Sequence, residues 1–172
     1  MKHAFIGLCI FIAACSGQSL SPTSPSAIAG AGAQTQAKGG EAPVEVTFTK
    51  WVTAFPALAG TSGGDAAGTF AGTFLSRDPF DNGVIVQLEA EYRVTATNPA
   101  HSFVARIEGK QNNETLHAVL NGTVIGGWRA GAQVHVTYDI VDPAPGTSCV
   151  PSAPVNRRCF QGTIRILPGS AD

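Results

Sequence analysis

Apolar and polar residues alternate along most of the chain after residue 43, as in β-strands whose two faces meet different surroundings. The clearest run spans residues 84–96. Its apolar positions are Val84, Val86, Leu88, Ala90, Tyr92, Val94 and Ala96, and its polar positions include Gln87, Glu89, Glu91, Arg93 and Thr95. A helix would scatter both sets around its circumference. This segment is therefore predicted to be a long strand with one buried face.

The same period predicts further strands near residues 44–53, 67–75, 103–108, 116–120, 134–140 and 160–166. Turn signals separate them, including Asn82-Gly83, Asn98-Pro99 and Gly126-Gly127. Residues 142–154 contain several prolines and no period, which indicates a long loop. No segment after residue 43 has a helical period.

These elements predict an all-β domain, a small antiparallel β-barrel of seven or eight strands. Strands of about ten residues in simple chain order suit a closed barrel. The alternative is a β-sandwich, which would have shorter strands and often a disulfide between its sheets.

The first fifteen residues have a different character. Lys2 precedes a short apolar run, and Ile12-Ala13-Ala14-Cys15 ends it. The run is too short to span a bilayer, which is typical of a processed export signal. Its last four residues resemble the lipobox of bacterial lipoproteins. The resemblance implies a signal peptide over residues 1–14, a lipidated Cys15 and, because Ser16 follows, sorting to the outer membrane of a two-membrane cell envelope. The alternative is an ordinary secretory signal in which Cys15 has no role.

Residues 15–43 would then be the lipidated cysteine and a flexible tether, rich in Ser, Pro, Ala and Gly. A tether of about 28 residues has an end-to-end distance of roughly 30 Å. The alternative is that part of it packs on the domain as an extra strand. The β-domain is expected over residues 44–168, followed by a short tail at residues 169–172.

The cysteines support export. Cys9 lies in the signal, which leaves Cys149 and Cys159 as a pair. Disulfides persist outside the cytoplasm, so we expect these two to be bonded. A reactive or metal-binding pair is the alternative, but no matching Cys or His cluster accompanies them. The sequence indicates no metal and no cofactor.

Three patterns suggest catalysis only weakly. Gly60-Thr61-Ser62-Gly63-Gly64 matches the Gly-x-Ser-x-Gly motif of hydrolases, but no helix follows it, so we interpret it as a Gly-rich connector. Glu89 and Glu91 share a strand face and could act as an acid–base pair. Other charged residues lie on the same face, which favours a solvent-exposed sheet face without catalytic function. His117 and His135 lie on polar faces and could form a metal or base site with Asp139 only if their strands bring them together.

Two loops carry side chains typical of binding sites: Trp128-Arg129, between glycines, and Arg157-Arg158, beside the predicted disulfide. We predict that a partner contacts Trp128, Arg129, Arg157 or Arg158, and that it does not depend mainly on the charged strand face of Glu89, Glu91 and Arg93. The alternative for Trp128 is a structural plug at one end of the barrel.

The function predicted from the sequence is therefore that of a lipid-anchored cell-envelope protein whose non-enzymatic β-domain binds a small ligand or an envelope protein. A net charge of −1 gives no reason to expect nucleic-acid binding. The alternative is an enzyme working inside the barrel, such as an isomerase or cyclase, by analogy with allene oxide cyclase. A filled apolar interior would favour binding, and a cavity beside a buried polar group would favour catalysis.

Overall fold

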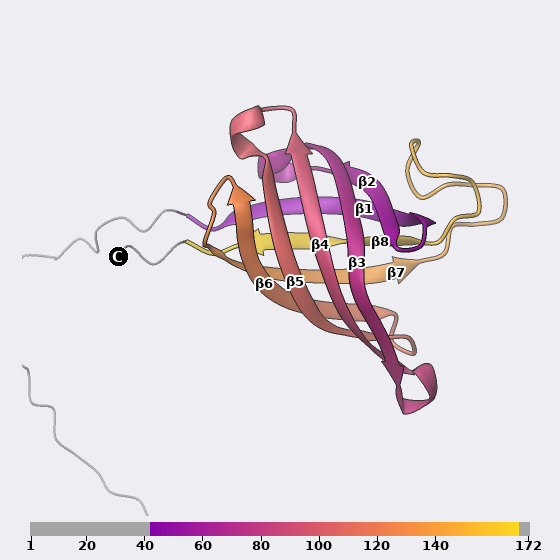
Figure 1. Ribbon diagram of the computed structural model, residues 1–172. Coiled ribbons are helices and arrows are strands. Elements are labelled where there is room, and N and C mark those ends of the chain that lie inside the picture. Colours follow the sequence, from indigo (N-terminus) through magenta and orange to yellow (C-terminus); the bar gives the residue numbers. More distant parts are fainter. Residues whose placement is uncertain (1–41, 169–172) are drawn as a thin grey trace, which may run out of the picture. The chain divides into compact units, whose positions relative to one another are not determined.

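Residues 42–168 are described by a computed structural model, in which eight antiparallel strands form a closed barrel (Figure 1). The strands are β1 (Val44–Ala54), β2 (Ala57–Ser62), β3 (Gly68–Phe80), β4 (Ile85–Ala96), β5 (Phe103–Asn112), β6 (His117–Gly127), β7 (Gln133–Val141) and β8 (Cys159–Ile166). Three 3₁₀ turns, η1 (Gly64–Ala66), η2 (Asp81–Gly83) and η3 (Pro99–His101), join strands. The predicted barrel is confirmed, and the sandwich is excluded. The lipobox, Cys15 and the proposed tether up to residue 41 lie outside the described residues.

Each strand pairs with the next one in the chain, and β8 pairs with β1 to close the barrel. This last ladder runs from Val44 opposite Ile166 to Trp51 opposite Cys159. Closure removes the free strand edges that an open sheet would expose. Within residues 42–168, no helix has the length and apolar character needed to cross a membrane.

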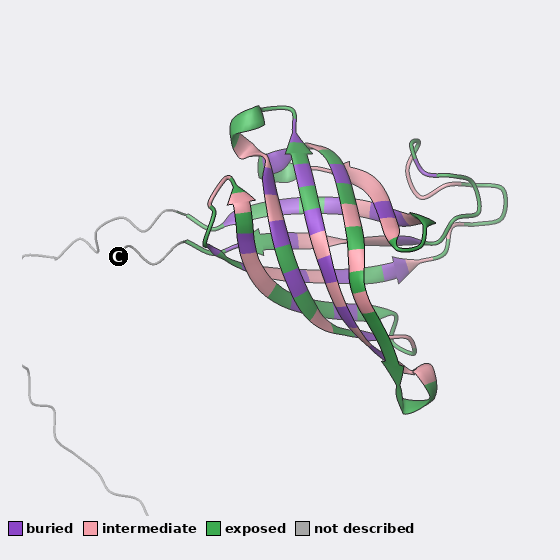
Figure 2. Cartoon of the chain, viewed as in Figure 1, coloured by how far each residue is buried: buried purple, intermediate pink, exposed green. Residues whose placement is uncertain are grey.

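The alternation read from the sequence sets the two faces of the wall (Figure 2). From Val86 to Ala96, every second residue of β4 is buried inside the barrel. Arg93 and Thr95, between them, are exposed on the outside. Burial of these apolar side chains supplies the main stabilisation of the domain.

One expectation is wrong. Gly60-Thr61-Ser62 was expected to lie in a connector but belongs to β2, which pairs with β1 and β3. A Cβ on Gly60 would lie 2.8 Å from the Cα of Lys50. A larger residue at position 60 would therefore clash with β1. The strand was missed because Ala57–Ser62 is made mostly of Gly, Ala and Ser, which show no alternation of apolar and polar residues.

The barrel has two different ends. The β1–β2, β3–β4, β5–β6 and β7–β8 connections surround one end, which we call the mouth. The other three connections lie at the opposite end, together with Val44 and Ile166, because neighbouring strands alternate in direction (Figure 1). This arrangement places the two predicted binding loops at opposite ends, with residues 157–158 at the mouth and residues 128–129 in the β6–β7 connection.

Candidate functional site

A lysine lies inside the barrel. Lys50 occupies an inward position of β1 and is only 1% exposed. Its Nζ donates a hydrogen bond to the Tyr92 hydroxyl. Five aromatic rings surround the amine, with centroids 4.0–5.9 Å from Nζ: Tyr92, Tyr138, Phe48, Phe160 and Phe70. Burial lowers the pKa of Lys50 well below its usual value, because the interior solvates an ammonium poorly.

Glycines make room for this polar group. Lys50 is opposite Gly60, Tyr92 is opposite Gly72, and Tyr138 is opposite Gly162. A Cβ on Gly162 would lie 2.6 Å from the Cβ of Tyr138. On one neighbouring strand, the residue opposite each of these three large side chains is therefore a glycine. The missing side chains leave space inside the barrel for Lys50, Tyr92 and Tyr138.

A chain of hydrogen bonds runs from the interior to the mouth. The Tyr138 hydroxyl donates to Gln111 Oε1 at 2.9 Å, and Gln111 Nε2 donates to Asn113 Oδ1 at 2.7 Å. Asn113 Nδ2 in turn donates to the carbonyl oxygen of Gly83, in the β3–β4 turn. Burial raises the pKa of Tyr138, so its hydroxyl stays protonated and remains a donor.

A cavity of about 410 Å³ opens at the mouth. Six of its lining residues are apolar and four are polar: Val52, Phe55, Phe74, Leu88, Ile140 and Phe160, with Arg77, Gln111, Asn113 and Arg158. Phe160 borders both the cavity and the Lys50 amine. The cavity and the buried amine are therefore neighbours, separated by an aromatic ring.

A β-bulge brings Arg77 to this cavity. The β3–β4 register shifts between Phe74 and Ser76, so that Leu75 is the extra residue. Beyond the bulge, Arg77 lies opposite Leu88, which is buried inside the barrel. Without the bulge, Arg77 would face outward, since side chains alternate strictly along a strand. Within the described part of the chain, Arg77 forms no ion pair.

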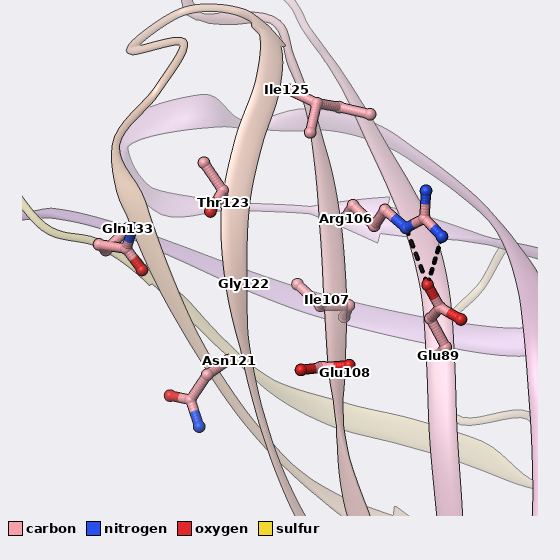
Figure 3. Close-up of a pocket in the computed structure, with 9 residues that line it drawn as sticks. All are labelled: Glu89, Arg106, Ile107, Glu108, Asn121, Gly122, Thr123, Ile125 and Gln133. Atoms are coloured by element: carbon pink, nitrogen blue, oxygen red, sulfur yellow. Dashed lines mark hydrogen bonds and ion pairs between the residues drawn. The ribbon is translucent and has the colours of Figure 1, made fainter.

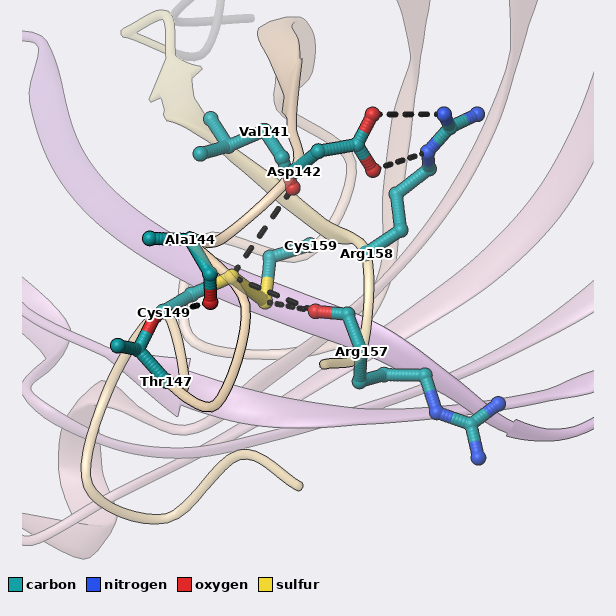
Figure 4. The surroundings of a disulfide bond; sticks show 8 residues. All are labelled: Val141, Asp142, Ala144, Thr147, Cys149, Arg157, Arg158 and Cys159. Atoms are coloured by element: carbon teal, nitrogen blue, oxygen red, sulfur yellow. Dashed lines mark hydrogen bonds and ion pairs between the residues drawn. A yellow bond between two sulfur atoms is a disulfide. The ribbon is translucent and has the colours of Figure 1, made fainter. Parts of the chain in front are cut away.

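The β7–β8 loop places a second guanidinium at the mouth (Figure 4). Cys149 and Cys159 form the expected disulfide. Beside it, Arg158 donates to both carboxylate oxygens of Asp142, at 2.6 and 2.7 Å, and this lowers the pKa of Asp142. Under the loop, on the outer wall, Trp51 packs with Ala153 and Cys159. The disulfide thus holds the segment that carries Arg158 against the barrel.

The loops around the mouth are unusually apolar. Phe55, Phe80, Leu116 and Val155, one at each of the four connections, are 38–67% exposed. Among the described residues, no exposed large apolar side chain lies in the three connections at the opposite end. Exposed apolar side chains gathered around a cavity commonly mark a site of contact with apolar molecules.

A second hollow, of about 470 Å³, lies on the outer wall over β4–β7 (Figure 3). Its residues are largely polar, and Arg106 Nε donates to Glu89 Oε1 at 2.8 Å across it. Glu91 contacts Arg93. Glu89 and Glu91 therefore each have an arginine partner, as expected for charged side chains on a solvent-exposed sheet face. Within residues 42–168, no group of three or more His, Cys, Asp or Glu could hold a metal ion.

The histidine cluster does not form. β6 and β7 do pair, but His117 contacts Asp139 at 2.7 Å, and His135 contacts Asn121 at 2.8 Å. The two histidines are four register positions apart, about 13 Å along the strands.

Ser62, the serine of the Gly-x-Ser-x-Gly pattern, donates a hydrogen bond to the Ala66 carbonyl oxygen, which is a local structural contact.

The four predicted binding residues do not form one site. Arg157 and Arg158 are at the mouth, whereas Trp128 and Arg129 are in the β6–β7 connection at the opposite end. Trp128 packs against the barrel core and stacks on His101, with centroids 4.1 Å apart. This arrangement fits the structural plug better than a free contact surface.

Sequence reasoning missed Lys50 and Arg77. A signal for Lys50 was present, because it continues the inward series Val44, Val46, Phe48. Arg77 gave no such signal, since the direction of its side chain depends on the bulge.

Comparisons with protein-family models, curated proteins and solved structures found no match to the chain.

Proposed function

We propose that this protein is an exported, lipid-anchored barrel that binds a small, elongated apolar molecule with an acidic head group. The chemical class is that of medium-chain fatty acids. The ligand would insert its chain into the mouth cavity and place its carboxylate against Arg77. The observation that carries the proposal is an apolar cavity with a guanidinium at its entrance that forms no ion pair within the described residues.

The dimensions and surroundings support this ligand class. Ligand cavities commonly measure about 300–1,000 Å³, and this one measures about 410 Å³. Its walls are largely apolar, which suits an alkyl chain. The exposed apolar loops around the entrance suit a ligand that arrives from an apolar phase, such as the bilayer near a lipid anchor.

An enzyme is the second candidate, and the buried Lys50 amine is the observation that favours it. Buried groups with strongly shifted pKa values are common in active sites. The amine is nevertheless covered by aromatic rings and does not border the cavity. Ligand binding therefore needs no rearrangement, whereas chemistry at Lys50 requires one.

Binding is tested with decanoate and decan-1-ol, which share a chain and differ in the head group. Displacement of a fluorescent apolar probe should show decanoate binding more tightly. Arg77→Gln should weaken decanoate binding about tenfold, the equivalent of about 1.4 kcal/mol, and leave decan-1-ol unchanged. Arg93→Gln, on the outer wall, is the matched control. Equal affinities for the two ligands, or an unchanged Arg77→Gln protein, would refute the role of Arg77.

The lipid anchor is tested separately. Mass spectrometry of the mature protein from a bacterial host should find an acylated N-terminal Cys15, and Cys15→Ser should prevent this processing. An unmodified N-terminus that begins elsewhere would exclude the anchor without affecting the cavity.

A further inference from the structure

We propose that Lys50 forms a reversible imine with the carbonyl group of an aliphatic aldehyde admitted through the mouth cavity. The inference rests on the proposed function, because the aldehyde must first occupy the cavity as the fatty acid would.

The surroundings of the amine favour a nucleophile. Lys50 Nζ is enclosed by aromatic rings and hydrogen-bonds to Tyr92. Among the described residues, no carboxylate forms an ion pair with it to hold it as an ammonium. Its lowered pKa has the same cause, burial without a counter-charge. A desolvated, neutral lysine amine is the form that attacks carbonyl groups.

Phe160 contributes both to the wall of the cavity and to the aromatic shell around the amine. Its ring centroid is 5.7 Å from Lys50 Nζ, and the same residue lines the cavity. Phe160 is only partly buried and packs edge-on against Tyr138. The proposal requires its side chain to rotate toward the mouth, so that an aldehyde in the cavity reaches Nζ.

Tyr92 supplies the proton that the reaction needs. The nitrogen lone pair of Lys50 attacks the carbonyl carbon, and the carbonyl oxygen becomes the hydroxyl of a carbinolamine. The carbon–oxygen bond then breaks as the Tyr92 hydroxyl protonates the leaving hydroxyl. The amine loses two protons overall: the first moves to the carbonyl oxygen as the carbinolamine forms, and the second returns to the Tyr92 oxygen as the iminium becomes an imine. The products are an imine and water. No oxidant or reductant takes part.

The test is reductive trapping of the purified full chain with decanal and cyanoborohydride, followed by peptide mass mapping. Cyanoborohydride converts an imine into a stable secondary amine. At pH 7 we expect Lys50, whose pKa burial lowers, to be alkylated faster than the exposed Lys110. Phe160→Ala should accelerate the alkylation of Lys50. Tyr92→Phe should slow it about 100-fold, as for the loss of a general acid.

Each outcome is informative. Alkylation of Lys110 with Lys50 unmodified, in both the wild type and Phe160→Ala, would overturn the proposal. Decanoate binding, measured on the same preparation, separates the two hypotheses. If decanoate binds and Lys50 does not react, only the imine is excluded. If decanoate also fails to bind, the proposed function fails with it.

Discussion

Phe160 lies directly opposite Lys50 on the β1–β8 ladder, and it borders both the Lys50 amine and the mouth cavity. The barrel interior therefore holds an accessible, largely apolar cavity beside a buried polar centre, and Phe160 borders both. The accessible part suits ligand binding, and the sealed part suits chemistry. Which of them a ligand reaches depends on the position of this ring.

The buried amine should make stability depend on pH. The pKa of Lys50 is lower in the folded chain than in the unfolded chain, so between the two values the unfolded chain binds more protons. The free energy of unfolding should then rise with pH, by up to about 1.4 kcal/mol per pH unit. Urea unfolding from pH 6 to 8.5, which stays more than one pH unit below the ordinary tyrosine pKa of about 10, measures this.

Lys50→Met should be more stable than the wild type at pH 7 and should lack this rise. Lys110→Met, which removes an exposed lysine, should keep it. A wild-type slope identical to that of Lys50→Met would show that Lys50 titrates as an ordinary lysine.

The disulfide should stabilise the domain without determining the fold. It joins residues separated by 10 positions, and closing so short a loop stabilises by about 2.5–3 kcal/mol in the chain-entropy model. Replacing both Cys149 and Cys159 with serine should lower the melting temperature and preserve the β-sheet circular dichroism spectrum. It should also weaken decanoate binding, because Arg158 adjoins Cys159 at the cavity. An unchanged melting temperature would contradict this account.

The opposite end of the barrel should matter for stability and not for binding. Trp128→Ala should destabilise the domain by about 2–3 kcal/mol, through the loss of its packing on the core and on His101. Decanoate affinity should be unchanged when measured well below the melting temperature. Loss of affinity in a folded Trp128→Ala protein would move the binding site to that end.

Gly122 is expected to tolerate no side chain. A Cβ there would overlap the carbonyl oxygen of Arg106 on β5, so Gly122→Ala must separate two paired strands. We expect a loss of about 2–3 kcal/mol in urea unfolding. At Gly126, also on β6, an added Cβ would meet no atom within 4 Å, and Gly126→Ala should change stability by less than about 0.5 kcal/mol. Equal effects of the two substitutions would show that the strand contact at Gly122 is not limiting.

The sequence was informative where local physics decides. Period-two alternation predicted the long strands and their buried faces, since a side chain's face follows from its position in the strand. The disulfide followed by elimination, since Cys149 and Cys159 were the two cysteines outside the predicted signal and lipidation site. β2 was missed because Ala57–Ser62 has almost no bulky side chains to show a period.

The candidate site depends on the closed barrel. Alternation places Lys50 on the inner face, but only pairing of β8 with β1 brings Phe160 over it and leaves the amine 1% exposed. Arg77 turns inward because one extra residue in β3 reverses the alternation, and that residue is visible only in the register with β4. Trp128 and Arg158 were both predicted to lie in binding loops, yet they lie at opposite ends because successive antiparallel strands reverse direction. The sequence by itself therefore determined the class of fold and the face of most side chains. Only the tertiary structure decided which residues meet, because the meeting depends on register and closure between strands distant in the chain.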